Sequence, residues 1–193
     1  MKYVANRITN FIVKHGAIGD KDFEVYEYGF LIGLEAGICV LVTITEAFLF
    51  GMVIEWFFFF MTFIPLRSYA GGLHLSRFSS CLLLSNAVFL IVLGMSRKLS
   101  MEPGIMFFYI ILLSVCIYSL YPIENSNREV TPKEKLIIRQ KFNKVICGLL
   151  LISTIMFILS YEKGLKLQLL TLLMLAITMA VGKLLSMHQN LFS

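Results

Sequence analysis

Charged residues are scarce in this chain: of its 193 residues, only 15% are Asp, Glu, Lys or Arg. Hydrophobic residues make up 58% of the sequence, whereas soluble domains of this length have about 45–50%. No polar stretch is long enough to bury a core of its own, which excludes a separate soluble domain. The composition therefore predicts an integral membrane protein that forms a single domain over residues 1–193.

Several sequence signals are also absent. The four cysteines form no CxxC pair, and neither HExxH nor GxGD occurs, so we expect no metal and no cofactor. The net charge of +5 comes from basic residues that fall between apolar runs, which excludes the basic face of a nucleic-acid-binding protein. The first 16 residues contain no apolar stretch of the signal-peptide type, so insertion is expected to use the spans themselves.

Long apolar runs dominate what is present. Each is near the roughly 20 residues that cross a bilayer, and backbone groups in lipid must bond internally, so each run should be a helix. The second run is short and the fifth is marginal. Together they predict an all-α, polytopic membrane protein with about six transmembrane helices in residues 29–185. The runs cover 29–50, 52–66, 79–96, 103–122, 145–161 and 165–185.

Lysines and arginines indicate the orientation of these spans. They gather in two segments, the N-terminal one and a loop predicted at 123–144, and four spans lie between the two. Both segments and the C-terminus are therefore expected on the cytoplasmic side. The loop after the second run, with Arg67 and Arg77, is then cytoplasmic too. The ten residues are Lys2, Arg7, Lys14, Lys21, Arg128, Lys133, Lys135, Arg139, Lys141 and Lys144.

Residues 1–28 are predicted to form an amphipathic segment at the cytoplasmic face. Apolar residues recur there at helical spacing, with polar and basic residues opposite. Such a helix could lie on an anionic leaflet, or it could pack on the other spans without touching lipid. The residues of the apolar face are Val4, Ile8, Phe11, Ile12 and His15.

His74 and Cys81 form the candidate catalytic pair. A thiolate is a strong nucleophile, and an imidazole can remove its proton. In an unbroken helix the two residues would be about 10 Å apart along the axis, which is too far for a direct contact. Gly71 and Gly72 would let the chain fold back, and a helix start at Cys81 would stabilise the thiolate. The spacing alone does not distinguish catalysis from a structural role.

The motif around this pair resembles a known family. Residues 67–81, RSYAGGLHLSRFSSC, are similar to the R-x-x-x-G-G-x-H-x6-C pattern of the accessory gene regulator protein B (AgrB) family. An amphipathic N-terminal segment, the stretch YPIENSNREVTPKEK and a closing GKLLS at 182–186 also resemble that family's layout. Length and number of spans fit over essentially the whole chain.

The resemblance implies a membrane cysteine endopeptidase that processes the precursor of a quorum-sensing peptide. Its nucleophile would match Cys81 and its general base His74. The substrate would be a short AgrD-like propeptide, which loses its C-terminal tail and is closed into a thiolactone or lactone through an acyl-enzyme. The family also implies a homodimer in a bacterial cell membrane, with the active site toward the cytoplasm.

Other polar residues near the motif have two interpretations each. Glu35 lies inside the first span, where a carboxylate is a functional candidate. It could orient His74 as the third member of a triad, or balance Arg67 or Arg77. Arg67 could bind an acidic substrate tail, or act only as a positive residue that fixes topology.

Two other classes of function remain open. One is a small transporter or channel, for which spans broken by Gly or Pro, or several mid-span charges, are expected. The other is a non-catalytic membrane adaptor for a peptide. Replacing Cys81 distinguishes them, because only the peptidase must lose all processing.

Overall fold

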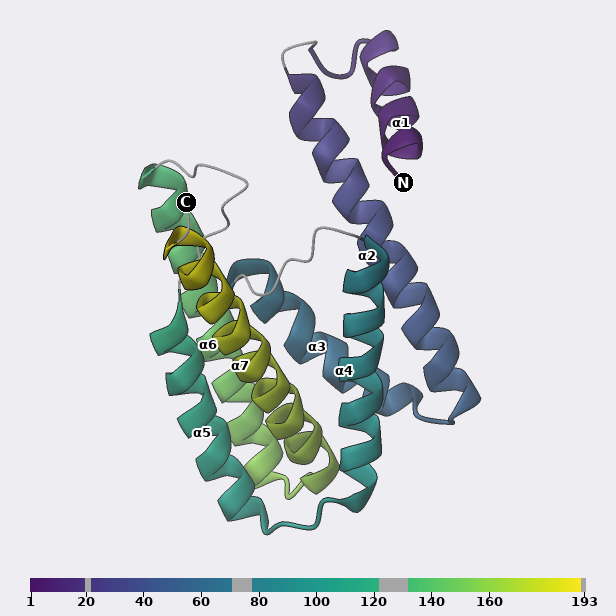
Figure 1. The fold of residues 1–193 in the computed structure, drawn as a ribbon. Coiled ribbons are helices and arrows are strands. Elements are labelled where there is room, and N and C mark those ends of the chain that lie inside the picture. The colour runs from purple at the N-terminus through teal and green to yellow at the C-terminus, as the bar shows by residue number, and fades with distance from the viewer. Residues whose placement is uncertain (20–21, 71–77, 122–131, 192–193) are drawn as a thin grey trace.

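Helices account for almost all of the computed structural model, which describes residues 1–19, 22–70, 78–121 and 132–191, apart from the side chains of 132–134 and 186–191. This described part has no strand, which confirms the all-α prediction. Figure 1 shows the helices. In chain order they are α1 (Lys2–Lys14), α2 (Phe23–Leu49), α3 (Val53–Ala70), α4 (Phe78–Lys98), α5 (Pro103–Leu120), α6 (Pro132–Ile158) and α7 (Glu162–Leu191).

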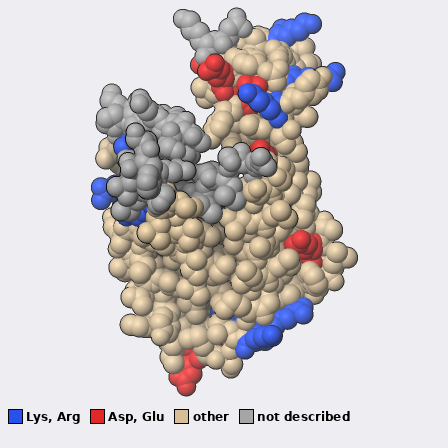
Figure 2. Space-filling view, in the orientation of Figure 1, with Lys and Arg blue, Asp and Glu red and all other residues tan. Residues whose placement is uncertain are grey.

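Five of the described helices, α2, α4, α5, α6 and α7, are long and apolar enough to cross a membrane. The second predicted run, 52–66, corresponds to α3, which has 18 residues, carries Glu55 and Arg67 and is not among these five helices. Figure 2 shows charged side chains gathered toward the two ends of the molecule, with a mostly uncharged surface between them. Many large apolar side chains are exposed on that surface, among them Leu83 (70%) and Phe108 (62%). An apolar belt of this kind suits lipid rather than water.

Helix α7 is the centre of the bundle. It contacts α3, α4, α5 and α6, and 56% of its apolar stretch is buried, against 6% for α2. One buried cluster joins α7 to α3, α5 and α6 around Leu66, Ile110 and Phe142. A second joins α7 to α2, α3 and α4 around Phe59 and Phe89, whose ring centroids are 5.3 Å apart. These two clusters fix the positions of α3 and α4, which carry the candidate motif.

The N-terminal helix is amphipathic, as predicted, and it packs on α2 (Figure 1). Its contact face uses small residues, because Ala5 and Thr9 are both 0% exposed. Asn6 Nδ2 also donates a hydrogen bond to Glu27 Oε1 at 2.8 Å. Val4 and Phe11 stay exposed at 45% and 63%. The helix therefore packs on a span and still presents apolar side chains outward.

Three helices extend six or more residues beyond the predicted runs, among them α7, which ends at Leu191 rather than 185. Helix α2 begins at Phe23 rather than 29, and α6 begins at Pro132 rather than 145. The loop predicted at 123–144 is therefore helical from Pro132 onward, and its first part lies outside the described residues. Lys, Glu, Leu, Gln and Arg have high helix propensity, so the helix continues past the apolar run although its hydropathy falls.

Chain direction alternates so that α1, the start of α4 and the end of α7 lie at one end of the bundle (Figure 1). The links from α2 to α3, α4 to α5 and α6 to α7 lie at the other end. This arrangement agrees with an even number of membrane crossings between α1 and the end of α7. The start of α4, which holds Cys81, lies at the first of these ends.

Candidate active site

Cys81 lies in the first turn of α4, which begins at Phe78. The backbone N–H groups of a helix's first turn have no partners within the helix and carry its positive dipole end. The side chain is half-buried, so it remains reachable while packed between helices. Within the described residues Cys81 thus lies in the first turn of α4, as predicted for a position near a helix start, and the residues before Phe78 lie outside that part of the chain.

Arg67 reaches Cys81 from the neighbouring helix. It lies in the last turn of α3, and its half-buried guanidinium is within electrostatic and hydrogen-bonding reach of the Cys81 sulfur. A guanidinium is always charged and donates through five N–H groups. The contact brings together two residues of the motif that are fourteen positions apart in the sequence.

Cys39 joins this site from α2, which the sequence did not indicate. Its sulfur is within hydrogen-bonding reach of the Ser85 hydroxyl, and it also lies near Cys81. Ser85 is one helical turn after Cys81 on α4. The site is therefore formed where α2, α3 and α4 meet. From sequence alone, Cys39 is a small apolar residue in an apolar run, and nothing there indicates its neighbour.

Glu35 lies on the same face of α2 as Cys39, since four residues separate them. It is nearer the start of α2 by about 6 Å. The side chain is half-buried, and within the described ranges it has no hydrogen bond or ion pair. The structure therefore shows no ion pair between Glu35 and Arg67, and Arg77, its other possible partner, lies outside the described residues. Its possible role in orienting His74 stays a prediction.

Four of the predicted site residues, Gly71, Gly72, His74 and Arg77, lie outside the described residues. They belong to the segment that connects Ala70, the end of α3, to Phe78, the start of α4. The predicted contact between His74 and Cys81 is therefore untested.

The other two cysteines lie away from this junction. Cys116 on α5 and Cys147 on α6 are exposed on the apolar surface, where a free cysteine acts as a small hydrophobic residue. All four cysteines are free thiols. In the part of the chain that the structure describes, no three His, Cys, Asp or Glu side chains converge on a metal position.

Comparison with protein families gives one result that bears on this geometry. The model of the family Accessory gene regulator B matches residues 5–181. The matched region runs from α1 to α7 and includes all of the helices that form the site. Comparisons with curated proteins and with solved structures gave no match.

Proposed function

The chain belongs to the accessory gene regulator B family, and from this premise we propose that it is a membrane-embedded cysteine endopeptidase. Family membership supports involvement in the processing of a quorum-sensing peptide. The proposed substrate is a short propeptide whose C-terminal tail is removed. The proposed product is a thiolactone or lactone peptide formed through an acyl-enzyme on Cys81.

One observation carries the proposal: Cys81 lies in the first turn of α4 with the Arg67 guanidinium within reach of its sulfur. A helix N-terminus and a permanent cation both stabilise a thiolate. The other three cysteines lack this combination, because they lie inside the runs of α2, α5 and α6. The contact favours a role for Arg67 in the reaction over a role in topology alone.

The reaction that this arrangement supports has two acyl transfers. In the first, the Cys81 sulfur attacks the carbonyl carbon of the scissile peptide bond, and the thiol proton passes to His74 and then to the leaving amine. The tail departs, and a thioester joins the rest of the propeptide to Cys81. In the second, the propeptide's own thiol or hydroxyl attacks this thioester, its proton is removed, and the Cys81 thiolate leaves as the ring closes.

The surroundings of Cys81 favour cyclisation over hydrolysis. Water competes with the internal nucleophile for the thioester, so a site that limits water favours ring closure. Cys81 is half-buried where α2, α3 and α4 meet, and it lies two residues before Leu83, which is exposed on the apolar surface. In this proposal the propeptide approaches from the cytoplasm, along the membrane face where α1 lies.

A panel of cysteine variants tests the proposed function. The full-length protein and its cognate propeptide are co-expressed, and the peptide products are identified by mass spectrometry. Cys81→Ser should abolish tail removal, since serine is a much weaker nucleophile at neutral pH. Cys39→Ser is the matched control, because it makes the same substitution at the same helix junction and should leave cleavage intact.

Two outcomes would contradict the peptidase. Normal cleavage by Cys81→Ser at wild-type protein level would exclude Cys81 as the nucleophile. If Cys39→Ser and Cys81→Ser lose cleavage to the same extent, the place where α2, α3 and α4 meet has only a structural role. If the protein is a transporter or an adaptor, it does not cleave the propeptide itself. Tail removal would then be unaffected by Cys81→Ser, or it would be absent with the wild-type protein too.

A further inference from the structure

Two of the four free thiols, Cys39 and Cys81, lie on helices that pack against each other. Helices α2 and α4 run in the same direction and are in contact (Figure 1). Ala47 of α2 and Phe89 of α4 are both 0% exposed and belong to one buried cluster. Each lies eight residues after the cysteine of its own helix, at positions 39 and 47 and at positions 81 and 89. The two cysteines therefore lie at similar heights in the bundle.

The side chains between the two helices allow a close approach. Cys39, Thr43 and Ala47 follow one another at four-residue intervals and form one stripe of α2. All three are small, and small residues let helix backbones come close together. On α4, Ser85 follows Cys81 by one turn, and the Cys39 sulfur is within hydrogen-bonding reach of the Ser85 hydroxyl. Cys39 thus lies beside the stripe of α4 that contains Cys81.

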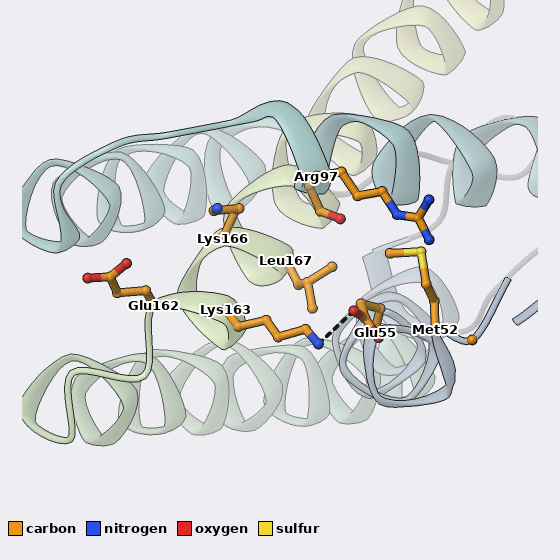
Figure 3. Close-up of a pocket in the computed structure, with 9 residues that line it drawn as sticks. Met52, Glu55, Arg97, Glu162, Lys163, Lys166 and Leu167 are labelled. Carbon is orange, nitrogen blue, oxygen red and sulfur yellow. Dashed lines mark ion pairs between the residues drawn. The ribbon is translucent and has the colours of Figure 1, made fainter.

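The polar contacts that hold these helices in place lie at the opposite end of the bundle. There, Lys163 Nζ of α7 lies 2.7 Å from Glu55 Oε1 of α3 (Figure 3). Arg97 Nη2, in the last turn of α4, donates to the carbonyl oxygen of Phe50 at the end of α2 at 3.2 Å. By contrast, only 6% of the apolar stretch of α2 is buried, and Cys81 lies in the first turn of α4, where helices fray. The thiols therefore lie where small movements of α2 and α4 cost little.

We propose that Cys39 and Cys81 form a reversible disulfide on exposure to hydrogen peroxide, and that this bond switches the peptidase off. The switch rests on the proposed function, because the bond occupies the sulfur that attacks the propeptide. A disulfide needs Cα atoms about 4.4–6.8 Å apart. Residue pairs of α2 and α4 already lie within 8 Å between Cα atoms, so a small movement of either helix brings facing cysteines into this range.

The reaction has two steps and consumes one molecule of peroxide. In the first, the Cys81 sulfur attacks one peroxide oxygen, the O–O bond breaks, and the other oxygen leaves as water with the thiol proton; the product is a sulfenic acid. In the second, the Cys39 sulfur attacks the sulfenic sulfur. The S–S bond forms, the S–O bond breaks, and a second water leaves with the Cys39 proton. The two thiols are oxidised and the peroxide is reduced, and a thiol reductant reverses the bond by exchange.

A protein that retains only these two cysteines tests the switch. Cys116→Ser and Cys147→Ser are combined in the full-length chain, which is purified in detergent under reducing conditions and then treated with hydrogen peroxide. Free thiols are alkylated, and the digested protein is analysed by mass spectrometry. We expect a linked pair of peptides that contain Cys39 and Cys81, in chains that run as monomers on a non-reducing gel. Cleavage of the cognate propeptide should fall in proportion to the linked fraction, and dithiothreitol should restore it.

Cys39→Ser in the same background is the matched control, because it removes only the second thiol. Without that thiol, peroxide should oxidise Cys81 past sulfenic acid to sulfinic acid, which thiols do not reduce. Dithiothreitol should then fail to restore cleavage, measured against the untreated rate of the same variant. If Cys39→Ser is poorly folded, Cys39→Ala takes its place with the same expected result.

Three results would overturn the switch. The first is loss of cleavage on peroxide treatment while Cys39 and Cys81 stay unlinked, which would leave the proposed peptidase intact. The second is linkage only between chains. The third is recovery of cleavage by dithiothreitol in Cys39→Ser as complete as in its parent. A disulfide within the chain that leaves cleavage unchanged would instead confirm the thiol pair and contradict Cys81 as the nucleophile, so failure of the switch and failure of the proposed function are distinguishable.

Discussion

Removing the guanidinium beside Cys81 should slow the first acyl transfer without unfolding the protein. Arg67→Gln keeps a polar side chain at the end of α3 but removes the charge within reach of the Cys81 sulfur. A hydrogen bond to a charged group contributes about 1.5–3 kcal/mol. If that stabilisation is lost from the attacking thiolate, the cleavage rate falls on the order of 10- to 100-fold. Arg67→Lys, which keeps the charge but not the planar fork, should recover part of the rate.

Two assays distinguish this role from a structural one. The first measures the rate of propeptide cleavage by purified protein, with variant levels matched. The second measures alkylation of Cys81 by iodoacetamide at neutral pH, in a background where Cys39, Cys116 and Cys147 are serine. Because the thiolate is the reactive form, Arg67→Gln should slow alkylation as well as cleavage.

Arg139→Gln is the control for this prediction, since Arg139 is an exposed arginine on α6. It should leave both rates near those of the wild type. Unchanged alkylation and cleavage in Arg67→Gln would refute the reasoning that the guanidinium stabilises the thiolate. A loss of cleavage with unchanged alkylation would instead indicate that Arg67 binds the acidic tail of the substrate.

Two further predictions concern the bundle and its orientation. Gly164→Ala should lower the melting temperature, because the added Cβ would lie 2.6 Å from Tyr161 Cδ1 and 2.8 Å from Met156 Sδ, and overpacking typically costs about 1–3 kcal/mol. Gly104→Ala is its control, since no atom lies within 4 Å of the added Cβ there; a lower melting temperature for Gly104→Ala alone would contradict the packing argument. A single cysteine introduced at Lys135 should resist an impermeant thiol reagent applied to intact cells, because α6 begins on the same side as α1 (Figure 1). Rapid labelling at that position would place this end of the bundle outside the cell.

Hydropathy predicted the helices better than their ends. The apolar runs correspond to α2 through α7 because backbone groups in lipid must bond within a helix. Residues 132–144 were wrongly predicted as loop. Their charged side chains lower the hydropathy of this stretch, although the same residues have high helix propensity. A helix can therefore extend beyond the apolar run that hydropathy identifies.

Only those features of the candidate site that depend on neighbouring residues in the sequence could be predicted. The position of Cys81 at a helix start follows from the apolar run that begins beside it. The approach of Cys39 depends on how α2 packs against α4, and residues 42 positions apart in sequence carry no local signal of contact. The sequence likewise left the role of Arg67 open, because a positive residue at a span end has a topological explanation. Its reach toward Cys81 depends on the packing of α3 beside α4.

The covalent intermediate provides the most direct test of the central claim. A propeptide in which alanine replaces the ring-closing Cys or Ser cannot cyclise, so the thioester on Cys81 should accumulate. Acid quenching during turnover, followed by mass spectrometry of the digested protein, should find the tail-less propeptide on the fragment that contains Cys81, in a bond that hydroxylamine cleaves. Tail removal by the wild-type protein with no adduct on Cys81, or with an adduct on another residue, would contradict the account.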